Sequence, residues 1–121
     1  MNIGITLRWE SREDKRPFSE YRKIPEHFIS MAERFNINLI PICTENAVNE
    51  LASICSGLVV TGSAINVNPS YYGEDKVILD NPVDEYKLDS KIIREFSENN
   101  KPILGICGGM QEVNVCFGGY T

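Results

Sequence analysis

Short apolar runs alternate along this chain with longer segments in which apolar residues recur at helical spacing. Four runs have the continuous hydrophobicity of buried strands: residues 2–7, 37–42, 57–60 and 103–106. The segments between them have helical periodicity: Phe28, Met31, Ala32 and Phe35 as one apolar stripe, then residues 47–54 and 83–99. This alternation predicts an α/β domain with a parallel sheet, helices on both faces and right-handed crossovers.

The predicted sheet also indicates where a ligand would bind. In open parallel sheets the binding crevice lies beyond the carboxyl ends of the strands. Three connections should meet there: a loop over residues 8–22, a second loop over residues 61–76, and the turn that contains Cys107.

The turn at Cys107 carries the most specific chemical signal in the chain. It follows a strand, precedes a helix expected to begin at Gly108, and has glycines two residues away on either side, Gly105 and Gly109. This G-x-C-x-G pattern is the thiol counterpart of the nucleophile elbow, in which the nucleophile has a strained backbone and flanking Cβ atoms would clash. The first N–H groups of the helix would favour the thiolate and could hold an oxyanion. A glycine-rich turn around a buried cysteine, or a phosphate-binding loop, would have a similar pattern.

A second segment offers a partner for this turn. Attack on an amide carbonyl needs two donors for the oxyanion, one just after the nucleophile and one from a neighbouring strand end. Gly62 and Ser63 follow the strand at 57–60 and are the candidates for the second donor. The far half of this loop, with its Asn-Pro and Tyr-Gly pairs, is typical of ordinary turns.

Composition narrows the class of protein. The 121 residues are expected to form one domain, residues 1–121, with 42% hydrophobic and 24% charged residues. The net charge of −5 without a basic tract argues against nucleic-acid binding. No stretch has the pattern of a membrane span or a signal peptide, so we expect a cytoplasmic protein with no membrane partner. The four cysteines form no C-x-x-C pair, which favours reduced thiols over a metal site.

Several segments together resemble the class I glutamine amidotransferase-like γ-glutamyl hydrolases, and within them the γ-glutamyl-γ-aminobutyrate hydrolase group. The resemblance runs from Ile3 to Gly119 and rests on residues 58–63, 66–69, 72–74, Asp84, residues 102–111 and the pair Gly118-Gly119. The expected fold is accordingly α/β and flavodoxin-like.

The resemblance implies a cysteine amidohydrolase. Cys107 would attack the γ-carbonyl of a small-molecule γ-glutamyl amide, the amine would leave, and water would release glutamate from the γ-glutamyl thioester. The N–H groups of Ser63 and Gly108 would form the oxyanion hole, and the expected substrate-binding residues are Gly62, Asn66 and Gln111. No metal and no organic cofactor is required.

The chain departs from the family pattern in three ways. Thr61 stands where Pro is usual, and Gly108 stands where Arg is common, which bears on recognition of the leaving group. Family members also continue beyond this length, and their triad His and Glu lie in that further portion. The single histidine, His27, is expected to be a solvated helix residue. We therefore expect a sheet that is incomplete at its C-terminus, and a second polypeptide or a missing C-terminal portion that carries His and Glu; a homo-oligomer is a further option.

Two other functions stay open at this stage: a glutaminase subunit that passes ammonia to a synthetase, and a catalytically inactive binding or assembly fragment. Arg8 or Arg12 would either reach a substrate carboxylate or lie in a solvated loop. Trp9 and Tyr21 would either line the crevice or cover the sheet, and Cys116 is expected in the core.

Overall fold

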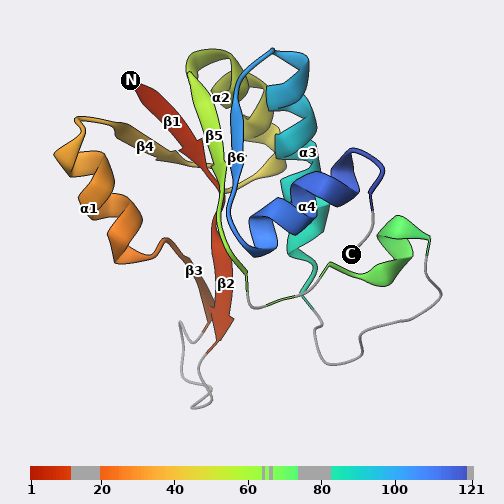
Figure 1. Ribbon diagram of the computed structural model, residues 1–121. Coiled ribbons are helices and arrows are strands. Elements are labelled where there is room, and N and C mark those ends of the chain that lie inside the picture. The colour runs from red at the N-terminus through yellow and green to blue at the C-terminus, as the bar shows by residue number, and fades with distance from the viewer. Residues whose placement is uncertain (12–19, 64, 66, 74–82, 120–121) are drawn as a thin grey trace.

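The computed structural model describes residues 1–11, 20–63, 65, 67–73 and 83–119. At its centre four parallel strands lie in the spatial order β4-β1-β5-β6 (Figure 1). Each predicted strand is present, β5 (Gly57–Val60) with the predicted bounds and the others slightly shorter: β1 (Asn2–Ile5), β4 (Asn38–Pro41) and β6 (Ile103–Gly105). The expected α/β, flavodoxin-like parallel sheet is therefore confirmed.

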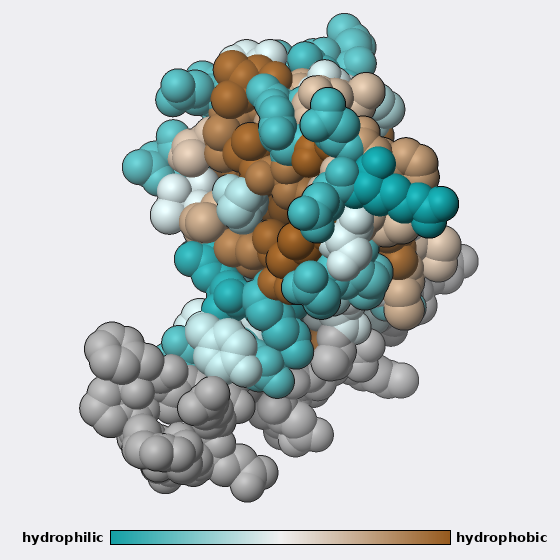
Figure 2. Space-filling model, turned by 90° about the vertical axis from the view of Figure 1, so that its left-hand side faces the viewer, coloured by the Kyte–Doolittle hydropathy of each residue, from teal (hydrophilic) through white to brown (hydrophobic). Residues whose placement is uncertain are grey.

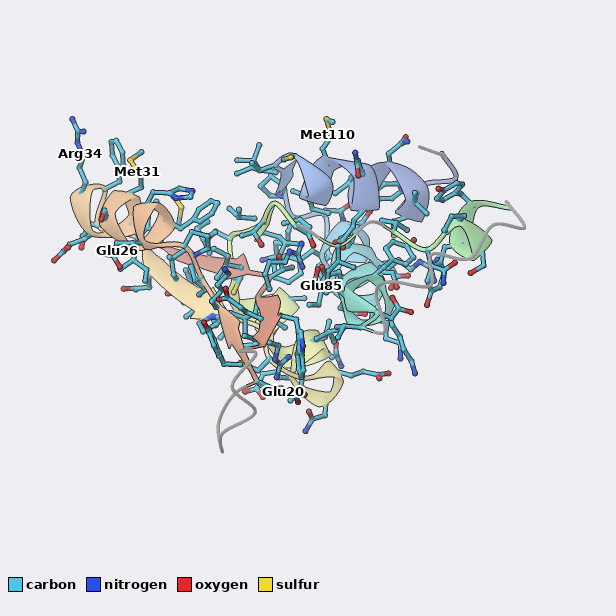
Figure 3. All side chains as sticks on the ribbon, turned by 90° about the horizontal axis from the view of Figure 1, so that it is seen from below. Glu20, Glu26, Met31, Arg34, Glu85 and Met110 are labelled. Atoms are coloured by element: carbon cyan, nitrogen blue, oxygen red, sulfur yellow. The ribbon has the colours of Figure 1, made fainter. Side chains whose placement is uncertain are left out.

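Helices cover both faces of this sheet (Figures 1 and 3). Two short 3-10 helices lie in the connections between these elements. One face carries α2 (Val48–Ile54) and α3 (Glu85–Glu98), and α4 (Gly108–Cys116) packs against α3 and β6; α1 (Glu26–Arg34) packs on β4 at the other face. The 3-10 helices are η1 (Glu45–Ala47) and η2 (Pro69–Tyr72). No helix in the described part of the chain has the length and apolar character needed to cross a membrane.

The main core lies between the sheet and the α2/α3 layer. Ile92, Ile93 and Phe96 of α3 are fully buried there. Gly4 of β1 makes room for this packing, because a Cβ at Gly4 would lie 2.9 Å from the ring of Phe96. Strand β6 forms one edge of the sheet. Its Leu104 is 59% exposed.

The segment expected as a loop over residues 8–22 instead contains two antiparallel strands, so that expectation was wrong. The strands β2 (Arg8–Ser11) and β3 (Glu20–Lys23) pair with Trp9 opposite Arg22. Glu10 of β2 links the two strands: it accepts a hydrogen bond from the Tyr21 hydroxyl at 2.6 Å and forms an ion pair with Lys23 at 3.1 Å. Every residue of β3 is exposed, so the ribbon lacks the alternation that marks a half-buried strand.

Helix α1 packs differently from its predicted apolar stripe. Ala32 is its only buried residue, whereas Met31 and Phe35 are 50% and 58% exposed. The helix instead turns Ile29 and Ala32 toward β4, where a groove of about 480 Å³ separates the two elements. Figure 2 shows hydrophobic residues gathered on this side of the molecule. The helical periodicity therefore located α1 correctly, but of the two larger side chains Met31 and Phe35 neither is buried against the sheet.

The core assignment predicts different responses for two phenylalanines. Phe96→Ala should lower the free energy of unfolding by about 3–5 kcal/mol, because it leaves a cavity in a fully buried site. Phe35→Ala should change it by less than about 1 kcal/mol, because that ring already contacts water. Urea unfolding of both variants checks this pair, and equal losses would contradict the placement of α1 and α3.

Candidate active site

Cys107 lies on a sharp turn between β6 and α4. Its backbone has φ 53° and ψ −114°, which is the sparsely populated conformation expected for a nucleophile elbow. The turn is held on both sides: Ile106 N–H donates to the Val60 carbonyl at 3.0 Å, and Met110 N–H donates to the Cys107 carbonyl at 3.0 Å. The cysteine itself is exposed. Its position therefore leaves the thiol accessible at the start of a helix.

The flanking glycines are required by close packing, as predicted. A Cβ on Gly109 would lie 2.0 Å from the Val60 carbonyl oxygen, and a Cβ on Gly105 would lie 2.8 Å from the Cα of Met110. Both neighbours are backbone atoms, which cannot move aside as a side chain can. The two glycines let α4 begin directly against the end of β5.

The loop after β5 lies beside Cys107. A Cβ on Gly62 would be 3.5 Å from the Cβ of Cys107, and a Cβ on Gly108 would be 2.9 Å from the Ser63 nitrogen. The structure therefore brings together four of the predicted site residues, Gly62, Ser63, Cys107 and Gly108. Their assigned roles remain predictions.

The other two predicted substrate-binding residues are placed less completely. Gln111 lies in the first turns of α4, half-buried, and its N–H donates to the Cys107 carbonyl at 3.3 Å. Asn66 lies outside the described residues.

Thr61, where the related family usually has Pro, makes hydrogen bonds that Pro could not make. Its N–H donates to the hydroxyl oxygen of Thr6 at 3.0 Å, and its hydroxyl lies 3.1 Å from that of Thr6. Both threonines are buried. The pair joins the end of β1 to the start of the loop that lies beside Cys107, so the backbone at this position is held by a polar contact instead of a proline ring.

Glu85 is a site residue that the sequence analysis missed. Figure 3 looks onto the carboxyl ends of the strands, and Glu85 lies near the centre of that view. One carboxylate oxygen accepts from the Ser63 hydroxyl, and the other accepts from the Trp9 N–H at 2.8 Å. The Ser63 oxygen in turn accepts from Ile65 N–H at 3.0 Å. Glu85 thus ties the loop beside Cys107 to strand β2.

A small cavity lies next to Glu85. It has a volume of about 210 Å³ and mixed polar and apolar walls, which include Leu7, Trp9, Arg22, Glu85 and Leu88. Trp9 therefore lines a cavity beside Glu85, but Cys107 is not among the residues that line this cavity, so whether Trp9 faces a substrate stays a prediction.

Arg8 does not reach toward the crevice, and the expectation that it could bind a substrate carboxylate was wrong. It is 4% exposed, forms an ion pair with Asp89 at 2.5 Å and donates a hydrogen bond to Glu112 at 3.4 Å. Asp89 and Glu112 are also buried, at 3% and 2% exposed. Arg12, the alternative, lies outside the described residues.

The carboxyl group of Glu112 has a raised pKa in this cluster. Burial raises the pKa of its carboxyl group to about 10, a hydrogen bond with Asp89 and the charge of Asp89 add to the rise, and Arg8 opposes it. The raised pKa favours the neutral form of Glu112 at neutral pH, and the Arg8 guanidinium forms its shortest ion pair with Asp89. The balance of charge explains how three ionisable groups can share a buried site.

The remaining candidates lie away from Cys107. His27 is exposed on α1, and α1 packs on β4, at the opposite edge of the sheet from β6. Cys43 is exposed and lies just after β4, and Cys116 is half-buried between the two hydrophobic clusters. No group of three His, Cys, Asp or Glu in the described segments is arranged to hold a metal ion.

The elbow packing predicts that Gly109→Ala is severely destabilising. We expect a loss of about 3 kcal/mol or more, because the added carbon would overlap the Val60 carbonyl. Gly62→Ala is the matched control: its nearest neighbour would be at an ordinary 3.5 Å, so a much smaller change is expected. Chemical unfolding of both variants tests this, and a tolerated alanine at 109 would show that α4 begins farther from β5.

The buried acid predicts a pH-dependent stability. The folded protein keeps the Glu112 proton up to a pKa of about 10, whereas the unfolded chain releases it near 4.5, so rising pH between these values favours unfolding. Glu112→Gln removes this titration, so its thermal midpoint should rise relative to wild type between pH of about 5.5 and about 8.5. Glu98→Gln, at the exposed end of α3, is the control. A difference that stays constant with pH would mean that Glu112 is ionised in the fold.

Comparison with known proteins is consistent with this geometry. A model of the family described as Peptidase C26 matches residues 2–121. A glutamine amidotransferase-like protein of Rickettsia prowazekii (strain Madrid E) is 33% identical over 78 residues, which are 61% of this chain and 27% of that protein. The glutamine amidotransferase-like protein YvdE of Lactococcus lactis subsp. lactis is 42% identical over 80 residues, 63% of this chain and 32% of that protein. A YvdE homolog of subsp. cremoris is 40% identical over 80 residues, 63% of this chain and 40% of that protein.

The matched residues thus span less than half the length of these relatives, whereas the family model covers all but the first residue of the chain. The strand–cysteine–helix turn and the parallel sheet agree with that match. The chain belongs to the Peptidase C26 family.

Proposed function

We propose that the protein provides the nucleophile for cysteine-dependent hydrolysis of a γ-glutamyl amide. The observation that carries this proposal is the backbone of Cys107, at φ 53° on a turn whose flanking glycines leave no space for a Cβ. A non-glycine residue in this conformation is unfavourable, and such strain is concentrated at functional sites. A phosphate-binding glycine loop would have no need of a strained, exposed thiol at its apex.

The chemistry is an acyl transfer in two stages. The Cys107 thiolate attacks the γ-carbonyl carbon, and the carbonyl oxygen becomes an oxyanion that Ser63 N–H and Gly108 N–H stabilise. The C–N bond then breaks, the leaving amine takes a proton, and a γ-glutamyl thioester remains on Cys107. Water attacks the thioester carbonyl and gives up a proton, so that glutamate is released and the thiolate is restored. Gly62, Asn66 and Gln111 would contact the glutamyl portion.

The proton for the leaving amine needs a donor that the described part of the chain does not place beside Cys107. The single histidine lies on α1, packed at the opposite edge of the sheet. We therefore propose that a histidine and a carboxylate come from a second polypeptide or from a further portion of the protein. Edge strand β6 and its exposed Leu104 offer a surface on which such a segment could add to the sheet.

Glutamine is the second candidate substrate. The relatives from Rickettsia and Lactococcus are named glutamine amidotransferase-like. A glutaminase would use the same Cys107 thioester and differ only in releasing ammonia, which a synthetase partner would consume. A panel of γ-glutamyl amides that includes glutamine therefore separates the two candidates.

The proposal predicts that Cys107 is the most reactive of the four thiols. It should be alkylated by iodoacetamide at neutral pH faster than Cys43, which is also exposed but does not begin a helix. Cys55 should react last, because burial raises the pKa of its thiol. Time-resolved mass mapping of the adducts checks this order. Faster labelling of Cys43 in the folded protein would contradict the elbow assignment.

Activity should depend on the supplementary segment. We expect residues 1–121 alone to release no glutamate from γ-glutamyl amides. Turnover should appear when a polypeptide brings a histidine to within about 3 Å of Cys107, and Cys107→Ser should abolish it. Intact mass, oligomeric state and glutamate release, measured on the same sample, test this. Robust Cys107-dependent turnover by the isolated monomer would refute the need for a partner and would make His27 a candidate base.

A further inference from the structure

The guanidinium of Arg8 contacts the backbone of the loop that contains Ser63. Its Nη2 donates to the Thr61 carbonyl at 2.7 Å, and its Nε donates to the Gly62 carbonyl at 3.2 Å. These are the last two carbonyl groups before the N–H of Ser63. One buried side chain thus holds two successive peptide groups at the point where the chain leaves β5.

The bond to the Gly62 carbonyl sets the direction of the Ser63 N–H. The two groups belong to the same peptide unit, and the described residues contain no cis peptide bond. In a trans peptide the C=O and the N–H point in opposite directions. Because the carbonyl faces Arg8, the N–H must face away from it. The Ser63 nitrogen lies close to Gly108, because a Cβ on Gly108 would be only 2.9 Å from it. Ser63 N–H is therefore beside the turn that contains Cys107.

Arg8 is itself held by the helices that build the elbow. Its Nη1 donates to Asp89 of α3 at 2.5 Å and to the Leu7 carbonyl at 3.1 Å, and its Nη2 also reaches Glu112 of α4 at 3.4 Å. Glu112 lies five residues after Cys107 on the helix that begins at the elbow. The guanidinium therefore links the loop with Ser63 to the helix with Cys107, through buried contacts on both sides.

We propose that Arg8 is a positioning residue, which fixes the Ser63 N–H toward the oxyanion that forms on a substrate bound at Cys107. This inference rests on the proposed function. It assigns a role to a buried cation that makes no contact with substrate. The required geometry is specific to arginine, because three nitrogens of one rigid plane donate to five acceptors in different directions, whereas a lysine ammonium is a single point on a flexible stem.

The proposal predicts a defect confined to the transition state. An oxyanion donor that points away from its target stabilises the transition state less and leaves substrate binding unchanged. In the assembly that shows Cys107-dependent turnover, Arg8→Lys should lower kcat about 10- to 100-fold. It should leave KM within about twofold and leave the rate of Cys107 alkylation unchanged. Arg34→Lys is the matched control, because Arg34 is exposed on α1 and points away from the molecule in Figure 3.

Two results would overturn the proposal. One is an Arg8→Lys variant with wild-type kcat. The other is a variant in which kcat and the Cys107 alkylation rate fall together, because that outcome would show a general loss of the elbow structure. Counting active sites by Cys107 alkylation keeps a partly unfolded sample from being mistaken for a slow enzyme.

A measurement on the wild-type protein decides the geometry even where the lysine variant does not fold. In an NMR exchange experiment, the Arg8 Nε–H should exchange with water at least about 10-fold more slowly than the exposed Arg34 Nε–H. Equal exchange rates would refute the contact with Gly62. Failure of the proposed function is separable from this result, because it would appear as absent Cys107-dependent turnover in wild type for every amide tested.

Discussion

The close approach of α4 to the end of β5 is the constraint on which the candidate site depends. The first turn of the helix passes so near the Val60 carbonyl that only glycine fits at position 109. The same approach forces Cys107 into a positive φ and brings Gly108 against Ser63. The geometry of the candidate site therefore depends on how tightly α4 packs on the end of β5.

Much of the fold followed from local patterns, and the misses have physical causes. The four parallel strands and the elbow were predictable because continuous apolar runs and paired glycines act over a few residues. The ribbon of β2 and β3 was not, because its residues are polar on both faces and its pairing depends on contacts such as Tyr21 with Glu10. The predicted stripe of α1 was only partly right: Ala32 is buried and Phe28 half-buried, whereas the larger Met31 and Phe35 stay exposed.

At the candidate site, too, local patterns could be predicted and contacts between distant residues could not. Cys107, Gly62, Ser63 and Gly108 were found because strand ends converge at one edge of a parallel sheet. Arg8, Asp89 and Glu112 could not be joined by any local rule, since 81 and 104 residues separate the arginine from its partners. A signal was present all the same: Asp89 is followed by Ile92 and Ile93 at helical spacing, so a carboxylate stands on the buried face of α3. A charged residue on an apolar helix face implies a buried partner elsewhere in the chain.

The positive φ of Cys107 also affects how a substrate complex could be captured. Alanine or serine at this position would keep the strained backbone, because each has a Cβ like that of cysteine. Glycine would relieve the strain and would make the inactive protein more tolerant of heat, while freeing the turn to adopt other conformations. The more stable glycine variant would thus be the less faithful copy of the native turn. Trapped complexes made with a serine or alanine variant would preserve the geometry that the thiol experiences.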